Sequence, residues 1–229
     1  MANEILSYLE MCQREGVSLQ RGMNYGLGGS HSVILASLRP DAPYDDELLE
    51  DGTILIYEGH DEPRSRDFPE PKQVDQPEVT TRGRLTQNGL FHKAAQDYCA
   101  GRRPPERVRV YEKLRQGIWS YSGMFHLVGC WKQQSLGRRV FKFRLVAVEG
   151  DEDLNAPVSL DAFPRRIIPS SVKLEVWRRD GARCVLCGAA DELHFDHIVP
   201  YSRGGTSLVA ENVQLLCARH NLQKRDRIQ

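Results

Sequence analysis

Two short motifs near the C-terminal end constrain this chain more than any other feature. They are Cys184-Val-Leu-Cys187 and Cys217-Ala-Arg-His220, and about thirty residues separate them. A two-residue spacer lets both side chains of such a pair turn toward one ion, and four thiolate or imidazole ligands are typical of a tetrahedral structural zinc. A redox pair at Cys184 and Cys187 is the alternative for the first motif alone. Two pairs at this spacing favour Zn²⁺.

The remaining sequence indicates a reducing compartment. The other cysteines, Cys12, Cys99 and Cys130, are scattered and suit free buried thiols, and no role is assigned to them. Apolar stretches such as 33–36 are too short for a transmembrane helix, and the N-terminus lacks the basic and apolar regions of a signal peptide. We therefore expect a soluble intracellular protein with no membrane partner.

A second group of residues lies between and just beyond the zinc motifs. Asp196-His197 stands at an expected strand end, and Pro200 and Gly204-Gly205 fill the following loop. Asn212 precedes a short apolar strand, 213–216, and Asn221 is expected to open a helix. This order resembles the HNH endonucleases, whose ββα-metal site is built from a strand, a loop, a second strand and a helix.

The resemblance implies a role for each of these residues. His197 would be the general base, since its pKa suits taking a proton from water, and Asn212 would orient the loop and His197. Asp196 and Asn221 would hold one Mg²⁺ or Mn²⁺, because hard oxygen ligands favour these ions over zinc. The family often has His at position 221, so Asn is a variant there. Strict strand alternation would point Asp196 and His197 to opposite faces.

Two histidines keep a structural alternative. The alternative to a general base at His197 is a histidine that only packs against its neighbours. His194, two residues before Asp196, is expected to be a strand histidine of the surrounding shell rather than a ligand.

Charge is distributed unevenly although the whole chain is neutral. Residues 1–80 hold 6 Lys and Arg against 16 Asp and Glu, and residues 81–150 hold 14 against 4. The remainder, 151–229, is balanced at 11 against 11. Clustered arginine suits phosphate binding, which releases counterions. Mutual pairing of the acidic and basic segments within one fold explains the pattern equally well.

Periodicity and turn residues predict an α+β protein in two parts. Helices are expected at 4–14, at 90–100 and from Ser170 or Ser171 to Trp177. Strands are expected at 32–37, 53–57, 108–111, 125–130 and 140–148, with a loop over 62–78. We predict an N-terminal domain over 1–150, a linker over 151–168 that is rich in acid and proline, and a C-terminal domain over 169–229.

The N-terminal part carries a series of short motifs in a defined order. They are Pro43-Tyr44-Asp45-Asp46, Ile56-Tyr57-Glu58-Gly59, Asp75-Gln76, Val108-Arg109-Val110-Tyr111, Tyr121-Ser122-Gly123-Met124-Phe125 and Val140-Phe141-Lys142-Phe143-Arg144-Leu145. Their order over roughly 15–149 resembles the SRA (YDG) domain, a crescent β-barrel that reads modified cytosine. The family signature Tyr-Asp-Gly is here Tyr121-Ser122-Gly123, so no acidic role passes to position 122.

The SRA resemblance implies that a modified cytosine is turned out of the duplex into a pocket. Tyr44 and Tyr57 would stack on the base, and Asp45 or Asp46 would accept from its N4 amino group; the spacing leaves both carboxylates open. Ordinary packing is the alternative for both tyrosines. Glu58 stands where a small hydroxyl residue is common. The candidates for DNA contact, for which solvated loop charge is the alternative, are Arg64, Arg66, Arg82 and Arg84.

Together the two parts resemble the SRA–HNH modification-dependent restriction endonucleases of prokaryotes. The resemblance implies a cytoplasmic enzyme that cuts double-stranded DNA carrying 5-methylcytosine or 5-hydroxymethylcytosine, as a homodimer because one HNH site cuts one strand. Two alternatives stay open. One is an HNH nuclease whose N-terminal domain reads unmodified sequence or a phosphorothioate, and the other is a non-enzymatic reader with a zinc-bound scaffold.

Overall fold

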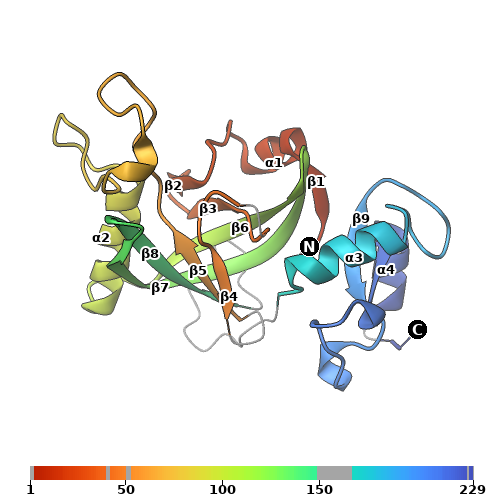
Figure 1. Ribbon diagram of the computed structural model, residues 1–229. Helices are drawn as coiled ribbons and strands as arrows, with labels where there is room; N and C mark the ends of the chain where they lie inside the picture. The colour runs from red at the N-terminus through yellow and green to blue at the C-terminus, as the bar shows by residue number, and fades with distance from the viewer. Residues whose placement is uncertain (1–2, 40–41, 50–52, 149–166, 226, 229) are drawn as a thin grey trace.

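The computed structural model describes residues 3–39, 42–49, 53–148, 167–225 and 227–228. It shows a large curved sheet with two helices, and a smaller unit built from two strands and two helices. The predicted α+β class is confirmed. In Figure 1 the smaller unit, in cyan to blue, lies to one side of the sheet.

The sheet is a strongly curved crescent of eight strands. The strands are β1 (Ile5–Ser7), β2 (Met23–Leu27), β3 (His31–Ala36), β4 (Glu47–Leu49), β5 (Ile54–Glu58), β6 (Glu106–Arg115), β7 (Ile118–Ser135) and β8 (Arg138–Ala147). Their order is β2-β3-β6-β7-β8-β5-β4, and β1 pairs with β7. Only the β3–β6 pair is parallel among the strand pairs described.

Helix α2 (Gln87–Cys99) covers the sheet and closes its main core. Thr86 caps the helix, since its side chain accepts a hydrogen bond from the Gly89 backbone N–H. Phe91 is fully buried in the same cluster as Phe141 and Phe143. The helix begins three residues before the predicted 90–100 because the cap at Thr86 satisfies its first turn. A 3₁₀ turn, η2 (Pro71–Gln73), lies in the predicted loop over 62–78.

The prediction of one helix over 4–14 is wrong in its first turn. Ile5–Ser7 forms β1 against β7, and helix α1 spans Tyr8–Glu15. Ser7 ends the strand and starts the helix through a capping box with Glu10. Local helical spacing could not show that β7 offers Ile5–Ser7 a free strand edge.

The smaller unit contains α3 (Ser170–Arg179), β9 (Leu193–His197), β10 (Val213–Cys217) and α4 (Ala218–Lys224), with short 3₁₀ turns η3 (Tyr201–Arg203) and η4 (Ala210–Asn212). Strands β9 and β10 pair in antiparallel register. Asn221 does not open the last helix as predicted. It is the fourth residue of α4, because the helix starts directly after β10.

The predicted domain boundaries, with a linker over 151–168 between the two parts, stay a prediction. Residues 151–166 of that linker lie outside the described part of the chain. Its last two residues belong to two different cores, since Ile167 packs in the sheet core and Ile168 packs in the core of the smaller unit. Within the described residues, no helix is long and apolar enough to cross a membrane.

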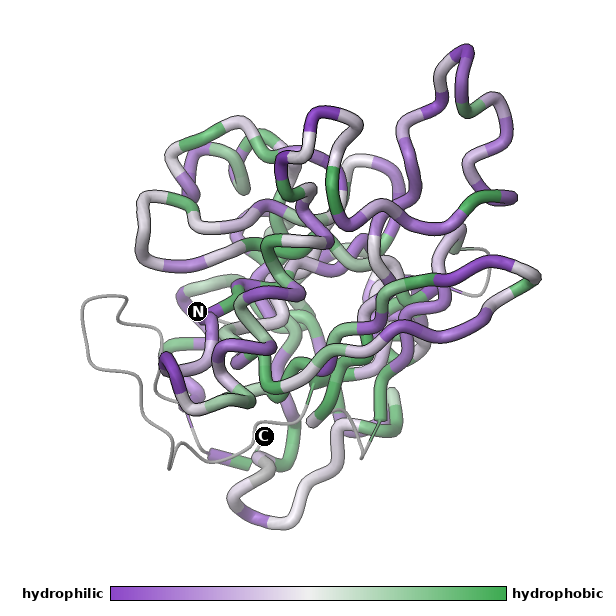
Figure 2. Tube along the Cα trace, turned by 90° about the vertical axis from the view of Figure 1, so that its left-hand side faces the viewer, coloured by the Kyte–Doolittle hydropathy of each residue, from purple (hydrophilic) through white to green (hydrophobic). Residues whose placement is uncertain are grey.

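Ion pairs join the acidic N-terminal third to the basic middle third. They include Arg109–Glu15, Lys132–Glu78, Arg138–Asp61, Arg139–Asp75 and Lys142–Glu58. Pairing within the fold therefore accounts for part of the charge asymmetry. Figure 2 shows the hydropathy along the chain, with hydrophilic stretches on the projecting loops and hydrophobic ones inside.

Candidate functional site

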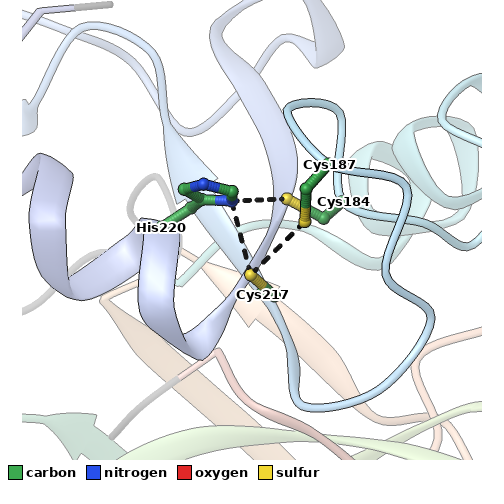
Figure 3. Close-up of side chains that lie close together, drawn as sticks. All are labelled: Cys184, Cys187, Cys217 and His220. Carbon is green, nitrogen blue, oxygen red and sulfur yellow. Dashed lines mark hydrogen bonds between the residues drawn. The ribbon is translucent and has the colours of Figure 1, made fainter.

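The four predicted zinc ligands lie together in the smaller unit (Figure 3). The Nδ1 of His220 is 3.3 Å from Cys184 Sγ and 3.4 Å from Cys217 Sγ, and Cys187 Sγ is 3.9 Å from Cys217 Sγ. All four ligand atoms lie within 4.8 Å of one another. Three thiols and one imidazole at this separation are the donor set of a structural zinc.

Local backbone geometry brings the ligands to one point. The knuckle at Cys184 closes when Gly188 N–H donates to the Cys184 carbonyl at 2.8 Å, and Gly188 has a left-handed φ of 75°. Burial pushes the pKa of the Cys184 thiol up. Hydrogen bonds from the Cys217 and Leu186 backbone and from His220 outweigh it and bring the pKa to about 6. A thiol of this kind readily gives the thiolate that zinc binds.

Asp196 and His197 end strand β9, and both are half-buried. The Asp196 carboxylate accepts a hydrogen bond from Gln214 Nε2 at 3.4 Å, across the β9–β10 pair. The Nε2 of His197 shares a 2.9 Å hydrogen bond with the hydroxyl of Ser207, which is buried. The two side chains therefore contact different segments, as strand alternation predicts.

Lys224 ties helix α4 to this strand end. Its buried ammonium group lies 2.9 Å from Asp196 Oδ2 and donates to the His197 carbonyl oxygen at 2.5 Å. Asn221 stands three residues earlier, so it lies on the same side of the helix. Its side chain makes no hydrogen bond to Asp196 among the residues described. The structure thus places Asn221 on the appropriate helix face without joining it to the carboxylate.

Asn212 holds the loop that follows β9. Its Nδ2 donates to the carbonyl oxygens of Val199 at 3.1 Å and Thr206 at 2.8 Å, and its Oδ1 accepts from Val199 N–H at 2.8 Å. Gly205 fits against the same group, because a Cβ there would lie 1.8 Å from the Val199 carbonyl oxygen. The loop is therefore tightly closed next to His197.

A cavity of about 550 Å³ lies in the sheet unit and is lined by both predicted tyrosines. Tyr57 comes from β5 and is almost fully buried, whereas Tyr44 precedes β4 and is half-buried. One face of the Tyr44 ring is covered by Lys72, whose Nζ is 4.0 Å from the ring centroid. Tyr57 also belongs to the main core, so packing and cavity lining coexist in one residue.

The two carboxylates that the sequence could not separate lie in different places. Asp46 lines the cavity, and its oxygens accept from the Glu58 backbone N–H at 2.9 Å and the Ser37 N–H at 3.3 Å. Burial raises the pKa of Asp46 to about 7. Asp45 is 84% exposed at its side chain and lies 3.4 Å from Lys142 Nζ, away from the cavity.

Glu58 does not line this cavity. It is buried in an ion cluster, 3.0 Å from Lys142 Nζ and 3.5 Å from an Arg138 guanidinium nitrogen. Glu58 follows Tyr57 in β5, so its side chain points to the other face of the sheet. The acid at this position therefore does not alter the shape of the cavity directly.

Sequence reasoning missed His60 and Asp61 in the cavity wall. The Nε2 of His60 accepts the Met23 backbone N–H at 2.9 Å, and burial lowers the pKa of this imidazole. Asp61 is held by Arg138 at 2.5 Å and by Lys72 at 3.0 Å. A polar pair directly after a buried strand was the available signal. Ser207 and Lys224 had no comparable signal, because their contacts depend on the folded loop and helix.

The predicted DNA-contact arginines lie on exposed loops. Arg64 and Arg66 precede η2, and Arg82 and Arg84 lie before α2. Of the other predicted residues, His194 is buried, and burial lowers the pKa of its imidazole.

Several solved structures are similar to this chain. The SRA domain of SUVH5 in complex with fully methylated CG DNA is 22% identical, with a TM-score of 0.44 over 65% of this chain and 89% of that chain. The modification-dependent restriction endonuclease TagI is 21% identical, with a TM-score of 0.43 over 97% and 76%. The type IV phosphorothioation-dependent restriction endonuclease ScoMcrA is 17% identical, with a TM-score of 0.45 over 99% and 52%.

A search of curated proteins finds no match. A family model described as HNH endonuclease matches residues 184–227. The matched segment contains the zinc cluster, the end of β9, Asn212 and α4. Residues 184–227 thus match the HNH endonuclease family, as their resemblance to it predicted, and are called the HNH domain below.

Proposed function

We propose that this protein is a modification-dependent DNA endonuclease. Its sheet unit captures a 5-methylcytosine or 5-hydroxymethylcytosine that is turned out of the duplex, and its HNH domain hydrolyses a phosphodiester bond nearby. The observation that carries the proposal is the presence, in one chain, of an HNH domain and a cavity lined by two tyrosines and a carboxylate.

The HNH domain supplies the residues of the cleavage step. His197, at the end of β9, takes a proton from the attacking water, and its hydrogen bond with Ser207 fixes the orientation of the ring. Asn212 keeps the adjoining loop closed. Lys224 holds the Asp196 carboxylate and the His197 backbone at one distance from α4.

Asp196 and Asn221 would hold a divalent cation in this domain. Both offer oxygen donors, a carboxylate and an amide, which fit Mg²⁺ or Mn²⁺ and leave the Cys and His ligands to zinc. When bound, the cation offsets negative charge on the phosphorane and on the leaving oxygen.

The cavity supplies groups that match a flipped cytosine. A methyl group is a small feature of the major groove, so a protein reads it with more discrimination when the base enters a pocket. Tyr44 and Tyr57 offer aromatic faces for stacking, and Asp46 offers an acceptor for the N4 amino group. The volume of about 550 Å³ lies within the range of roughly 300–1,000 Å³ that is usual for small-molecule sites.

A double-strand break requires two HNH sites, because each cuts one strand. We therefore propose that the protein acts as a homodimer on double-stranded DNA. Two identical chains related by a two-fold axis are the commonest symmetric oligomer. The exposed Arg64, Arg66, Arg82 and Arg84 are the proposed phosphate or groove contacts.

Digestion of matched duplexes tests the proposal. Duplexes of one sequence carry 5-methylcytosine, 5-hydroxymethylcytosine, a phosphorothioate or no modification, each incubated with Mg²⁺ or Mn²⁺. We expect cutting of the duplexes with modified cytosine only. Equal cutting of all duplexes would remove the reader assignment, and selective cutting of the phosphorothioate would assign a different modification. No cutting with either metal would favour a reader whose zinc unit is only a scaffold.

A further inference from the structure

Helix α3, which shares one apolar core with the HNH domain, meets the sheet at a buried charge cluster that neither proposed site uses. Lys173 of α3 is fully buried, and its Nζ lies 2.6 Å from Glu112 Oε2 on β6. The same ammonium donates to Ser122 Oγ on β7 at 3.3 Å. Ser170, the first residue of α3, donates a hydrogen bond to the other Glu112 oxygen. One helix of the nuclease side is therefore held by charge on two strands of the sheet.

Ser122 of this cluster belongs to one of the sequence motifs of the N-terminal part. It occupies the position at which the Tyr121-Ser122-Gly123 motif departs from the SRA signature. A serine here places a neutral hydroxyl beside Lys173, while the neighbouring strand supplies the carboxylate through Glu112. The buried cluster thus holds one positive and one negative charge.

Two further contacts join the same surfaces. Leu114 of the sheet lies in one apolar cluster with Val172 and Phe195 of the nuclease side. The backbone of Asn3 bridges the two parts, since Asn3 N–H donates to the Tyr121 carbonyl at 2.6 Å and Phe195 N–H donates to the Asn3 carbonyl at 3.0 Å. Figure 1 shows the adjoining β1 between the sheet and β9.

Apolar contact alone would not select one placement of the HNH domain. Hydrophobic burial is not directional, so an apolar interface tolerates sliding. A buried ammonium and a buried carboxylate are different, because either one left without its partner is strongly unfavourable. A shift of α3 along β6 that moved Lys173 away from Glu112 would leave each buried charge without its partner. The ion pair therefore favours the observed placement over shifted ones.

We infer that Glu112 and Lys173 are positioning residues that hold the HNH domain in one place relative to the base cavity. Cleavage then falls at one defined distance from the captured base. This inference rests on the proposed function and adds to it a geometric rule for the cut site. The inference concerns the position of the cut phosphodiester bond. Recognition of the base and the chemistry at His197 do not depend on it.

Mapping of cut positions tests the inference. The substrate is a duplex with a single 5-methylcytosine, labelled at either end, and the proteins are the wild type and the double variant E112L/K173M. The variant replaces the pair by apolar groups of similar size, a change that preserves folding in other buried ion pairs. The matched control is K93M/D97L, which removes the exposed Lys93–Asp97 pair of α2.

We expect one dominant cut position on each strand for the wild type and the control. E112L/K173M should cut at several neighbouring positions while its affinity for the modified duplex stays within about twofold, as for uncoupled sites. Scattered cutting by the wild type, or one unchanged position in a folded E112L/K173M, would overturn the inference and leave the proposed function intact. If E112L/K173M does not fold, the near-isosteric variant E112Q/K173M takes its place, with the same two outcomes. Equal cutting of modified and plain DNA would instead remove the proposed function.

Discussion

The side chain of Asn212 forms hydrogen bonds with both the backbone N–H and the backbone carbonyl of Val199. Its Oδ1 accepts the Val199 N–H at 2.8 Å, and its Nδ2 donates to the Val199 carbonyl at 3.1 Å. A third hydrogen bond, from Asn212 Nδ2 to the Thr206 carbonyl, closes the loop between Val199 and Thr206. Ser207 follows directly and contacts His197, so the position of the imidazole depends on a side chain fifteen residues away.

Gly205→Ala should disrupt this loop, whereas Gly204→Ala should be tolerated. A Cβ at Gly205 would meet the Val199 carbonyl oxygen at 1.8 Å and Asn212 Nδ2 at 2.8 Å. A Cβ at Gly204 meets nothing within 4 Å, although its φ of +84° costs an alanine about 1–2 kcal/mol. Single-turnover cleavage rates should fall strongly for G205A and only slightly for G204A. Equal rates for the two variants would contradict this account of the loop.

His197→Ala should abolish cleavage and spare binding. A general base contributes roughly 10²–10⁴-fold to rate, so we expect a loss of that size in the cleavage rate. Gel-shift affinity for a methylated duplex should remain unchanged, because the base cavity belongs to the sheet unit. Ser207→Ala removes only the orienting hydrogen bond and should cause a smaller loss. If H197A also loses binding, the histidine is a packing residue instead.

Removal of zinc should unfold the HNH domain. Metal analysis should find one Zn²⁺ per chain, and Cys187→Ser should lower that content. Structural zinc contributes apparent binding energies of about 10–16 kcal/mol in small zinc domains, so a chelator should abolish cleavage together with part of the near-ultraviolet circular dichroism. A protein that keeps full activity after complete loss of zinc would show that the cluster has another role.

Tyr44→Ala should reduce discrimination between methylated and plain DNA. Loss of one stacking face costs on the order of 1–3 kcal/mol for a bound base, which corresponds to a preference lower by roughly 5–150-fold. The ratio of the two binding constants is the measurement. Tyr98→Ala is the control, since Tyr98 is a half-buried tyrosine on α2 that does not line the cavity. An unchanged ratio in Y44A would remove Tyr44 from the proposed pocket.

The raised pKa of Asp46 should make stability depend on pH. Burial raises this pKa to about 7 from its ordinary value of 3.8, so the folded chain retains a proton that the unfolded chain releases between these values. The contribution of Asp46 to the free energy of unfolding therefore falls as pH rises from about 4 to about 7, by an amount on the order of a few kcal/mol.

Urea denaturation of the wild type and Asp46→Asn at several pH values measures this contribution. The stability of the wild type relative to D46N should decrease up to about pH 7 and stay level above it. Parallel curves for the two proteins would show that Asp46 has an ordinary pKa.

Contacts between residues close in the chain were predictable from sequence. The zinc ligands come in pairs with a two-residue spacer, so residue type and spacing largely determine the site. The strand, loop, strand and helix that follow the first pair come in order along the chain, which is why the family resemblance could propose roles for Asp196, His197 and Asn212. The short, mainly apolar runs of β3 and β5 likewise indicated buried strands, and every residue of both strands is buried.

Contacts between distant residues were not predictable. Adjacent carboxylates at Asp45 and Asp46 have the same chemistry, and only the fold shows which one lines the cavity. The strand at Ile5–Ser7 exists because β7 lies beside it, although its own spacing resembles a helix.

What the sequence by itself determined is the proposed chemistry of the HNH domain, because its candidate zinc ligands and its proposed general base lie within a few tens of residues of one another. Only the tertiary structure decided how that domain sits on the sheet. Glu112 and Lys173 are far apart in the chain, and each alone reads as an ordinary charged residue. Their pairing depends on two surfaces that meet after folding, where burial makes an unmatched charge unfavourable.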